Sequence, residues 1–195
     1  MDSLEHRRDA RRRTMLDTGA ALLGGSDGGT VSVRAVCRPT GITERYFYEA
    51  FGSRDEFVRA VYDYVSSRAQ KALFEAVQGT EDPLEVPAAA VTAFVELVID
   101  QPDLGRVLLL APYRESALAE YGLAHMSGFF TVVGSALPDE VDPTTRQLVS
   151  VGVVGAMTTL FTEFLSNRLD ASREQLIAFC RQFLGNYLRL PTDRL

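Results

Sequence analysis

Hydroxyl, guanidinium and phenol side chains are concentrated in one segment of the chain, SVRAVCRPTGITERYFYEAFGSRDEF. Ser32 and Thr43 carry hydroxyls that can cap a helix N-terminus by accepting from a backbone N–H. Arg45 has a planar fork that can pair with O6 and N7 of guanine, and Glu44 can accept from the N4 amine of cytosine. Arg54 adds a fixed positive charge at the start of a predicted helix, which suits a phosphate. These residue types predict contacts to the phosphates and bases of a nucleic acid.

Two short helices are predicted to position these side chains. Ser32 precedes VRAVCR, whose apolar residues recur at helical spacing, and Pro39 and Gly41 end that helix. Thr43 opens the second helix, TERYFYEAF, which ends at Gly52. Two short helices joined by a Gly-containing turn form a helix-turn-helix, whose second helix can lie in the major groove of DNA.

Longer helices are predicted on both sides of this motif. A helix from about Leu4 to Leu23 has a basic first half and an apolar second half. Its arginines could track a DNA backbone as a flexible arm or form the solvated face of the helix. Ser53 and Glu56 have capping-box spacing and open a long helix that extends to about Val77.

The rest of the chain predicts five further helices and no strand. They are expected at Pro83–Gln101, Asp103–Leu110, Tyr113–Leu137, Pro143–Leu169 and Ser172–Leu190. The uncharged stretch from Leu148 to Phe161 is shorter than the roughly 20 residues that a bilayer requires, so we expect a buried helix and no membrane partner. The predicted fold class is all-α, with a functional boundary between residues 1–52 and 53–195.

Charge is divided unevenly along the chain. The net charge is −6, but residues 1–60 contain ten arginines and nine acidic residues, so only this part is positive. We therefore expect any polyanion to bind there. The N-terminal MDSLEHRRDARRR lacks the apolar core of a secretory signal, which favours the cytoplasm. Cys37 and Cys180 lack metal-ligand spacing and are expected to be buried, with no metal and no cofactor.

The helix-turn-helix segment resembles the DNA-binding signature of the TetR family of transcriptional regulators. The matching residues are Gly41, Ile42, Thr43, Phe47, Tyr48, Phe51, Ser53, Arg54, Asp55 and Phe57. The resemblance covers about residues 8–60 and implies a three-helix DNA-binding domain followed by a larger helical ligand-binding and dimerisation domain. It also implies phosphate contacts by Thr43 and Tyr48, and it places Arg54 where the family usually has lysine. The sequence departs from the family at Pro39, at Tyr46, and at Arg45, where glycine is more common. It also departs at Glu44, where relatives usually have a basic residue and where a carboxylate would repel phosphate.

Two sets of candidate site residues follow. The candidates for DNA contact are Ser32, Arg34, Thr43, Glu44, Arg45, Tyr46, Tyr48 and Arg54. The candidates for ligand contact are Phe94, Arg106, Tyr113, Met126, Phe129, Phe130, Met157 and Phe161, although apolar residues at helical spacing are also what an ordinary core shows.

The resemblance further implies partners and a mechanism. The partners are double-stranded operator DNA, a second copy of the chain docked through the last two helices, and a small apolar or amphipathic effector. The effector would swing the long fourth helix and release the operator. A TetR-like activator and a regulator that responds to a protein partner are alternatives. A helical-bundle enzyme is disfavoured, since the chain has two histidines and no HExxH, GxSxG, GxGxxG or Walker sequence.

Overall fold

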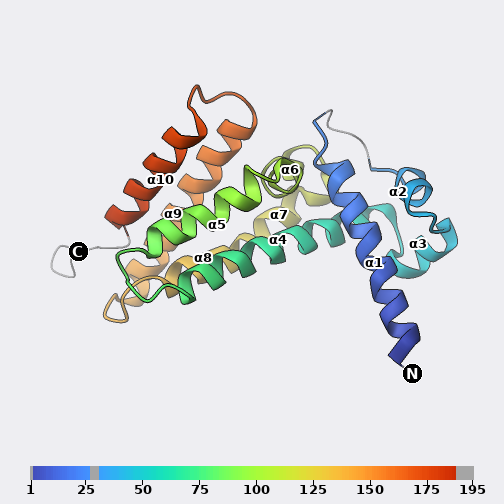
Figure 1. Ribbon diagram of the computed structural model, residues 1–195, viewed down its shortest axis with the longest axis horizontal. Helices are drawn as coiled ribbons and strands as arrows, with labels where there is room; N and C mark the ends of the chain where they lie inside the picture. The colour runs from blue at the N-terminus through green and yellow to red at the C-terminus, as the bar shows by residue number, and fades with distance from the viewer. Residues whose placement is uncertain (1, 27–30, 188–195) are drawn as a thin grey trace. The chain divides into compact units, whose positions relative to one another are not determined.

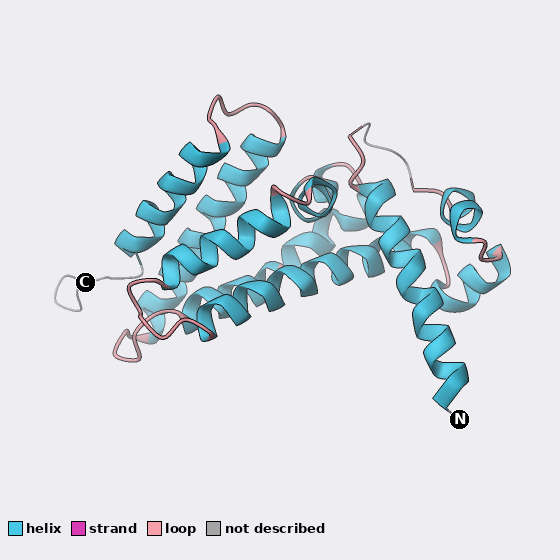
Figure 2. Cartoon of the chain, viewed as in Figure 1, coloured by secondary structure: helices cyan, strands magenta, loops and turns pink. Residues whose placement is uncertain are grey.

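The computed structural model describes residues 2–26 and 31–187, and every regular element in these ranges is helical (Figures 1 and 2). The helices are α1 Asp2–Leu23, α2 Val33–Thr40, α3 Glu44–Phe51, α4 Arg54–Gln78, α5 Val86–Val98, α6 Pro102–Leu109, α7 Ala119–Ala124, α8 Met126–Ser135, α9 Pro143–Leu165 and α10 Arg173–Tyr187. Two short 3-10 helices, η1 Ala111–Tyr113 and η2 Ser116–Leu118, lie between α6 and α7. The predicted all-α class is confirmed. The predicted end of the last helix at Leu190 and part of the GGSDGG loop lie outside the described residues.

The chain forms two compact units. The first comprises Met1–Ser67 and Pro102–Leu123, and the second comprises Arg68–Gln101 and Ala124–Leu195, as far as these residues are described. Helix α4 continues from the first unit into the second. These units are defined by how the chain packs, whereas the predicted boundary between residues 52 and 53 separates functions. The functional boundary therefore stays a prediction.

The core of the first unit is built around aromatic rings. Phe47 and Phe57 are fully buried, and their ring centroids lie 4.9 Å apart. Phe51 stands edge-on to Phe57 at 4.7 Å. Helix α1 contributes the buried Met15 and packs against α2 and α6, while α2 packs against α3. Each buried Phe stabilises the folded state by about 1.5–3 kcal/mol, so this cluster fixes α3 to the start of α4.

In the second unit α8 packs against α9, and α10 packs against α5 and α9. Asp142 caps α9 by accepting from the backbone N–H groups of Thr144 and Thr145 at 3.0 and 3.1 Å. Arg146 donates to backbone carbonyls at the end of α8, including those of Gly134 and Leu137. The turn between α8 and α9 is therefore held from both sides.

The predicted single helix Tyr113–Leu137 is wrong, because the structure breaks it into η2, α7 and α8. Glu115 is in an extended conformation, with φ −103° and ψ 113°, and its carboxylate pairs with Arg54. A second break occurs at His125, between α7 and α8. Local helical preference is a weak determinant over short stretches, so the composition of this segment did not reveal either break.

The prediction of a buried helix at Leu148–Phe161 holds for one face only. Val153, Val154 and Phe161 of α9 are buried, but Leu148 is 68% exposed and Val151 is 47% exposed. By length and composition α9 could also cross a membrane, a test that core helices of soluble proteins pass as well. Within one chain, the apolar outer face of α9 remains uncovered.

Candidate nucleic-acid interface

The turn between α2 and α3 is fixed by local hydrogen bonds. Ser32 caps α2 by accepting from the N–H of Ala35 at 3.2 Å, and Thr43 caps α3 by accepting from the N–H of Tyr46 at 3.3 Å. Between them Gly41 adopts a left-handed conformation with φ 65°. A residue with a side chain would be strained in this conformation. Both predicted caps and the predicted glycine turn are confirmed.

Helix α2 extends through Pro39 to Thr40, two residues beyond the predicted end of VRAVCR. Pro39 has no N–H to donate within the helix. The Thr40 hydroxyl donates to the carbonyl of Val36 at 2.8 Å and so contributes a bond to the last turn. The helix can therefore tolerate proline near its end.

Helix α3 has one buried face and one exposed face. Phe47 and Phe51 point into the core as predicted, whereas Thr43, Glu44, Arg45 and Tyr48 are exposed. Tyr48 is 50% exposed, and its ring stands edge-on to the buried Phe47 at 5.6 Å between ring centroids. This contact supports the Tyr48 ring from the core side. The structure places these four candidate residues on the face that a groove could receive.

Four exposed charged residues of α2 and α3 form two ion pairs. Arg34 lies 3.5 Å from Glu44 across the turn, and Arg45 donates from Nε to Glu49 at 2.8 Å along α3. The hydrogen bond to Glu49 raises the pKa of Arg45. Each of the four side chains is more than half exposed, and exposed ion pairs contribute little to stability. Both arginines can therefore exchange their carboxylate partner for a DNA group at little cost.

Tyr46 lies against α1, although the sequence placed it on the DNA-facing surface. Its hydroxyl donates to the carbonyl of Arg8 at 3.4 Å, and the guanidinium of Arg11 lies 5.4 Å from its ring centroid. The ring is partly buried. Tyr46 therefore helps to fix α3 to α1, and a base contact by this residue stays a prediction.

Arg12 holds the end of α3, a role that was not predicted. Its guanidinium donates to the carbonyl of Ala50 at 3.0 Å and lies 4.4 Å from the ring centroid of Phe51. A cation suits the free carbonyls at a helix C-terminus. Its position one turn before the buried Met15 and Leu16 was the available signal, since it places Arg12 near the inner face of α1.

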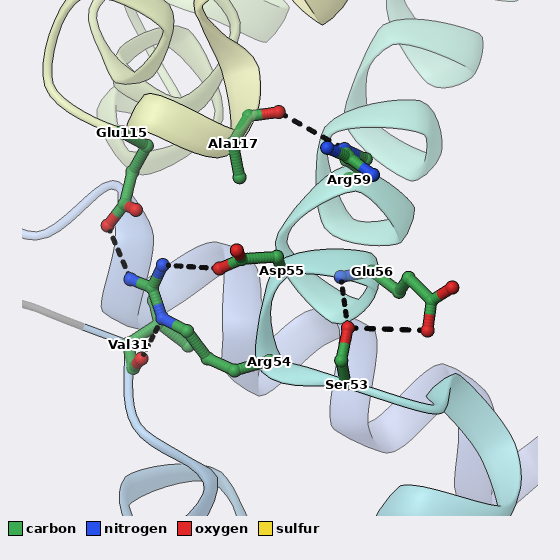
Figure 3. A network of polar contacts seen from close by, with 8 residues as sticks. All are labelled: Val31, Ser53, Arg54, Asp55, Glu56, Arg59, Glu115 and Ala117. Atoms are coloured by element: carbon green, nitrogen blue, oxygen red, sulfur yellow. Dashed lines mark hydrogen bonds and ion pairs between the residues drawn. The ribbon is translucent and has the colours of Figure 1, made fainter.

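Helix α4 begins with a variant of the predicted capping box (Figure 3). The N–H of Glu56 donates to the Ser53 hydroxyl at 3.1 Å, and this hydroxyl donates to the Glu56 carboxylate at 3.3 Å. In a standard capping box the acidic side chain would instead accept from the backbone N–H of Ser53. That N–H donates to the carbonyl of Phe51 at 2.9 Å.

Arg54 is bonded to three acceptors of the protein (Figure 3). It donates from Nε to the carbonyl of Val31 at 2.9 Å, from one terminal nitrogen to Asp55 at 3.1 Å, and from the other to Glu115 at 2.8 Å. Its side chain is 30% exposed. The predicted phosphate contact stays a prediction, and the structure adds a role within the fold, because Arg54 joins the start of α2 to the segment before η2.

Two further contacts fasten α4 to the segment around η2 and α7. Arg59 donates to the carbonyl of Ala117 at 3.2 Å, and the Tyr121 hydroxyl lies 2.9 Å from both carboxylate oxygens of Asp63 (Figure 3 for Arg59). Burial raises the pKa of the neighbouring Tyr62 to about 12, so its phenol stays neutral. The first part of α4 is thus anchored along its length.

The ligand-contact candidates are divided between the two units. Six lie in the second unit: Phe94, Met126, Phe129, Phe130, Met157 and Phe161. The rings of Phe94 and Phe161 meet edge-on at 4.8 Å. Arg106 and Tyr113 belong to the first unit, where Arg106 donates to Gly24 and Asp103, each at 3.2 Å, and Tyr113 is 77% exposed. The structure brings together part of the set, and the ligand role of all eight stays a prediction.

Thr162 is a buried polar residue of the second unit that the sequence analysis did not include among the ligand-contact candidates. Among the described residues, its hydroxyl is the one buried side-chain oxygen or nitrogen without a hydrogen-bond partner. It follows Phe161 on α9 and lies in the same unit as Phe94. A buried hydroxyl without a partner is unfavourable unless a ligand or water satisfies it.

No family model matches the sequence, and no curated protein matches it, but several solved structures share its fold. A Rhodococcus sp. protein assigned to the TetR family of transcriptional regulators is 16% identical, with a TM-score of 0.73 over 91% of this chain and 98% of its own. The fatty acid degradation regulator FadR of Bacillus halodurans is 13% identical, with a TM-score of 0.74 over 91% and 99%. A Syntrophomonas wolfei protein also assigned to the TetR family is 10% identical, with a TM-score of 0.75 over 95% and 99%. At these identities the similarity concerns the fold, and the predicted TetR-like fold is confirmed.

Proposed function

Starting from this TetR-type fold, we propose that the chain is a transcriptional regulator that binds a palindromic DNA operator as a homodimer and releases it when a small molecule binds. The observation that carries the proposal is the exposed face of α3, with Thr43, Glu44, Arg45 and Tyr48 on a helix whose other face is buried. A helix presented in this way, after a capped turn, has the form of a recognition helix.

Each exposed residue has a defined task in this proposal. Thr43 and Tyr48 donate hydroxyl hydrogen bonds to phosphates and set the register of the helix in the groove. Arg45 reads guanine, and Glu44 accepts from cytosine. In the free protein Glu44 pairs with Arg34 and Arg45 pairs with Glu49. The bond to Glu49 uses Nε of Arg45, so both terminal nitrogens can face a base edge while this ion pair persists.

A second copy of the chain completes the site. One helix-turn-helix of this size covers a single half-site, so specificity requires a partner at a fixed distance. The apolar face of α9 suits such a partner, because Leu148 and Val151 are exposed and a Cβ added to Gly152 or Gly155 would meet no atom within 4 Å. Helices with small residues at these positions can pack closely across a two-fold axis.

The effector is proposed to be apolar or amphipathic and to bind in the second unit. Phe94, Phe129 and Met157 offer apolar surface there, and the unbonded hydroxyl of Thr162 offers one polar anchor. The neighbour FadR regulates fatty acid degradation, which makes fatty acids a reasonable first class of compounds to try. Helix α4 belongs to both units and would carry the change to the DNA-binding part.

The direct test is a titration of labelled double-stranded DNA with the purified protein, followed by fluorescence anisotropy at several salt concentrations. A regulator binds the duplex with an affinity that falls steeply as salt rises, because phosphate contacts release counterions. Addition of medium- and long-chain fatty acids to the complex tests release. Failure to bind any duplex, even at low salt, would contradict the proposed function.

A further inference from the structure

Arg54 is one cation between two carboxylates. Glu115 and Asp55 both accept from its guanidinium, at 2.8 and 3.1 Å, so the three groups together carry a net charge of −1 (Figure 3). A phosphate that approaches the start of α4 therefore meets one positive charge that is already paired with two negative charges. The hydrogen bond to Val31 occupies Nε as well.

Glu115 holds Arg54 more firmly than Asp55 does. The Glu115 side chain is 13% exposed, whereas that of Asp55 is 59% exposed. A nearly buried carboxylate depends on its partner, because an isolated charge in that position would be strongly destabilising. The hydrogen bond from Arg54 to Glu115 is also the main reason that the pKa of Arg54 is raised.

The position of Glu115 is itself maintained by the fold. The residue lies 61 positions away from Arg54 in the sequence and adopts an extended conformation between η1 and η2. The contact from Arg59 to Ala117 fastens the same segment to α4 two residues later. The carboxylate is thus delivered to Arg54 by a segment that is anchored independently of it.

We propose that Glu115 is a positioning residue that withholds Arg54 from DNA, so that phosphate and the Glu115 carboxylate compete for one guanidinium. The inference rests on the proposed function. In the free protein the ion pair keeps Arg54 turned into the fold. On DNA, Arg54 contributes a phosphate contact only to the extent that it leaves Glu115. Glu115 therefore lowers DNA affinity while it stabilises the folded chain.

The test is Glu115→Gln in the full-length protein, compared with Glu120→Gln. Glu120 is an exposed residue of α7, and its substitution makes the same change in net charge. We expect Glu115→Gln to bind duplex DNA on the order of threefold to tenfold more tightly than Glu120→Gln at low salt, since the freed Arg54 adds one phosphate contact and its release of counterions. Its plot of log affinity against log salt should be steeper by up to about 0.9 for each Arg54 released to a phosphate.

A second substitution assigns the gain to Arg54. In an Arg54→Ala background, Glu115→Gln should raise DNA affinity no more than Glu120→Gln does, because the guanidinium for which phosphate and Glu115 compete is absent. Urea unfolding of each variant gives stability separately. If Glu115→Gln does not fold, Glu115→Asp retains the charge on a shorter side chain and should show a smaller gain in the same direction.

The outcomes are distinct. Equal affinity and salt dependence for Glu115→Gln and Glu120→Gln would overturn the inference, as would weaker binding by a folded Glu115→Gln, which indicates structural support alone. A gain that persists without Arg54 would also overturn it. If the unmodified chain binds no duplex while every variant is folded, the proposed function fails, and the inference fails with it.

Discussion

Glu44 and Arg45 are adjacent on the exposed face of α3, and each pairs with an opposite charge, Arg34 and Glu49 respectively. These pairs order the side chains before DNA arrives, and their exposure keeps the cost of breaking them small. Arg45 can then present both terminal nitrogens to a base edge. At the scale of the residue, the proposed function attributes sequence preference mainly to Arg45 and Glu44.

Arg45→Ala is expected to relax the preference for one base pair in each half-site. The loss of a bidentate contact to guanine should cost about 1–3 kcal/mol on the preferred duplex and much less on a duplex altered at that base pair. Competition binding with the two duplexes measures the difference. Arg38→Ala is the control, because Arg38 is an exposed arginine of α2 outside the candidate set. An equal loss on both duplexes would contradict base reading by Arg45.

Contacts between near neighbours in the sequence could be predicted, and contacts between distant residues could not. The capping hydroxyls of Ser32, Thr43 and Ser53 were predicted because each bonds an N–H three residues later. Arg12 meets Ala50 across 38 residues and Arg54 meets Glu115 across 61, and no spacing rule connects such pairs. The phosphate contact of Arg54 was therefore predicted without knowledge that Glu115 binds the same guanidinium.

At the scale of the element, the connection between α3 and α4 is constrained by its backbone conformation at Gly52. Gly52 has φ 77°, and its N–H donates to the carbonyl of Tyr48 at 2.9 Å. A Cβ on Gly52 would displace the Glu56 carboxylate, which is the end of a flexible and exposed side chain. The turn therefore depends on glycine chiefly for its backbone conformation.

Gly52→Ala is expected to lower the free energy of unfolding by about 1–2 kcal/mol, because alanine is strained at this φ. Urea unfolding monitored by circular dichroism measures the change. Gly25→Ala is the control, since φ of Gly25 is not positive and its added Cβ would make ordinary contacts at 3.4 Å. Unchanged stability of Gly52→Ala would show that the turn can adopt another conformation.

Helices with strong local signals were predicted well, and the one long prediction that failed lacked them. Caps and apolar periodicity identified α2, α3, α4 and α9. Between Tyr113 and Leu137 the composition favours a helix, yet Pro112 and the extended Glu115 start the segment as 3-10 turns. The extended backbone of Glu115 interrupts the helix and places its carboxylate beside Arg54, an arrangement that exists only in the folded chain.

At the scale of the whole molecule, the face of α9 that the described residues leave exposed is the surface where the proposed partner would dock. Leu148 and Val151 are exposed, and Phe179 of α10 is 51% exposed. Sequence reasoning assigned this region to a dimer interface, but it could not tell which side of α9 is buried within one chain. Val153, Val154 and Phe161 proved to belong to that inner side.

Leu148→Glu is expected to convert the proposed dimer to monomers, because it places a charge on the exposed apolar face of α9. Sedimentation velocity measures the mass in solution. Leu84→Glu is the control, since Leu84 is 56% exposed and lies outside α9 and α10. A Leu148→Glu protein with the mass of the unmodified protein would place the interface elsewhere.

Dimeric recognition of duplex DNA by α3 is tested most directly by selecting bound sequences from a pool of random duplexes. The account predicts an enriched inverted repeat, with half-site centres about one helical turn of DNA or a multiple of it apart. The Arg45→Ala protein should enrich the same repeat with one position in each half-site relaxed. Enrichment of a single asymmetric site, or of no sequence by a folded protein, would contradict the account.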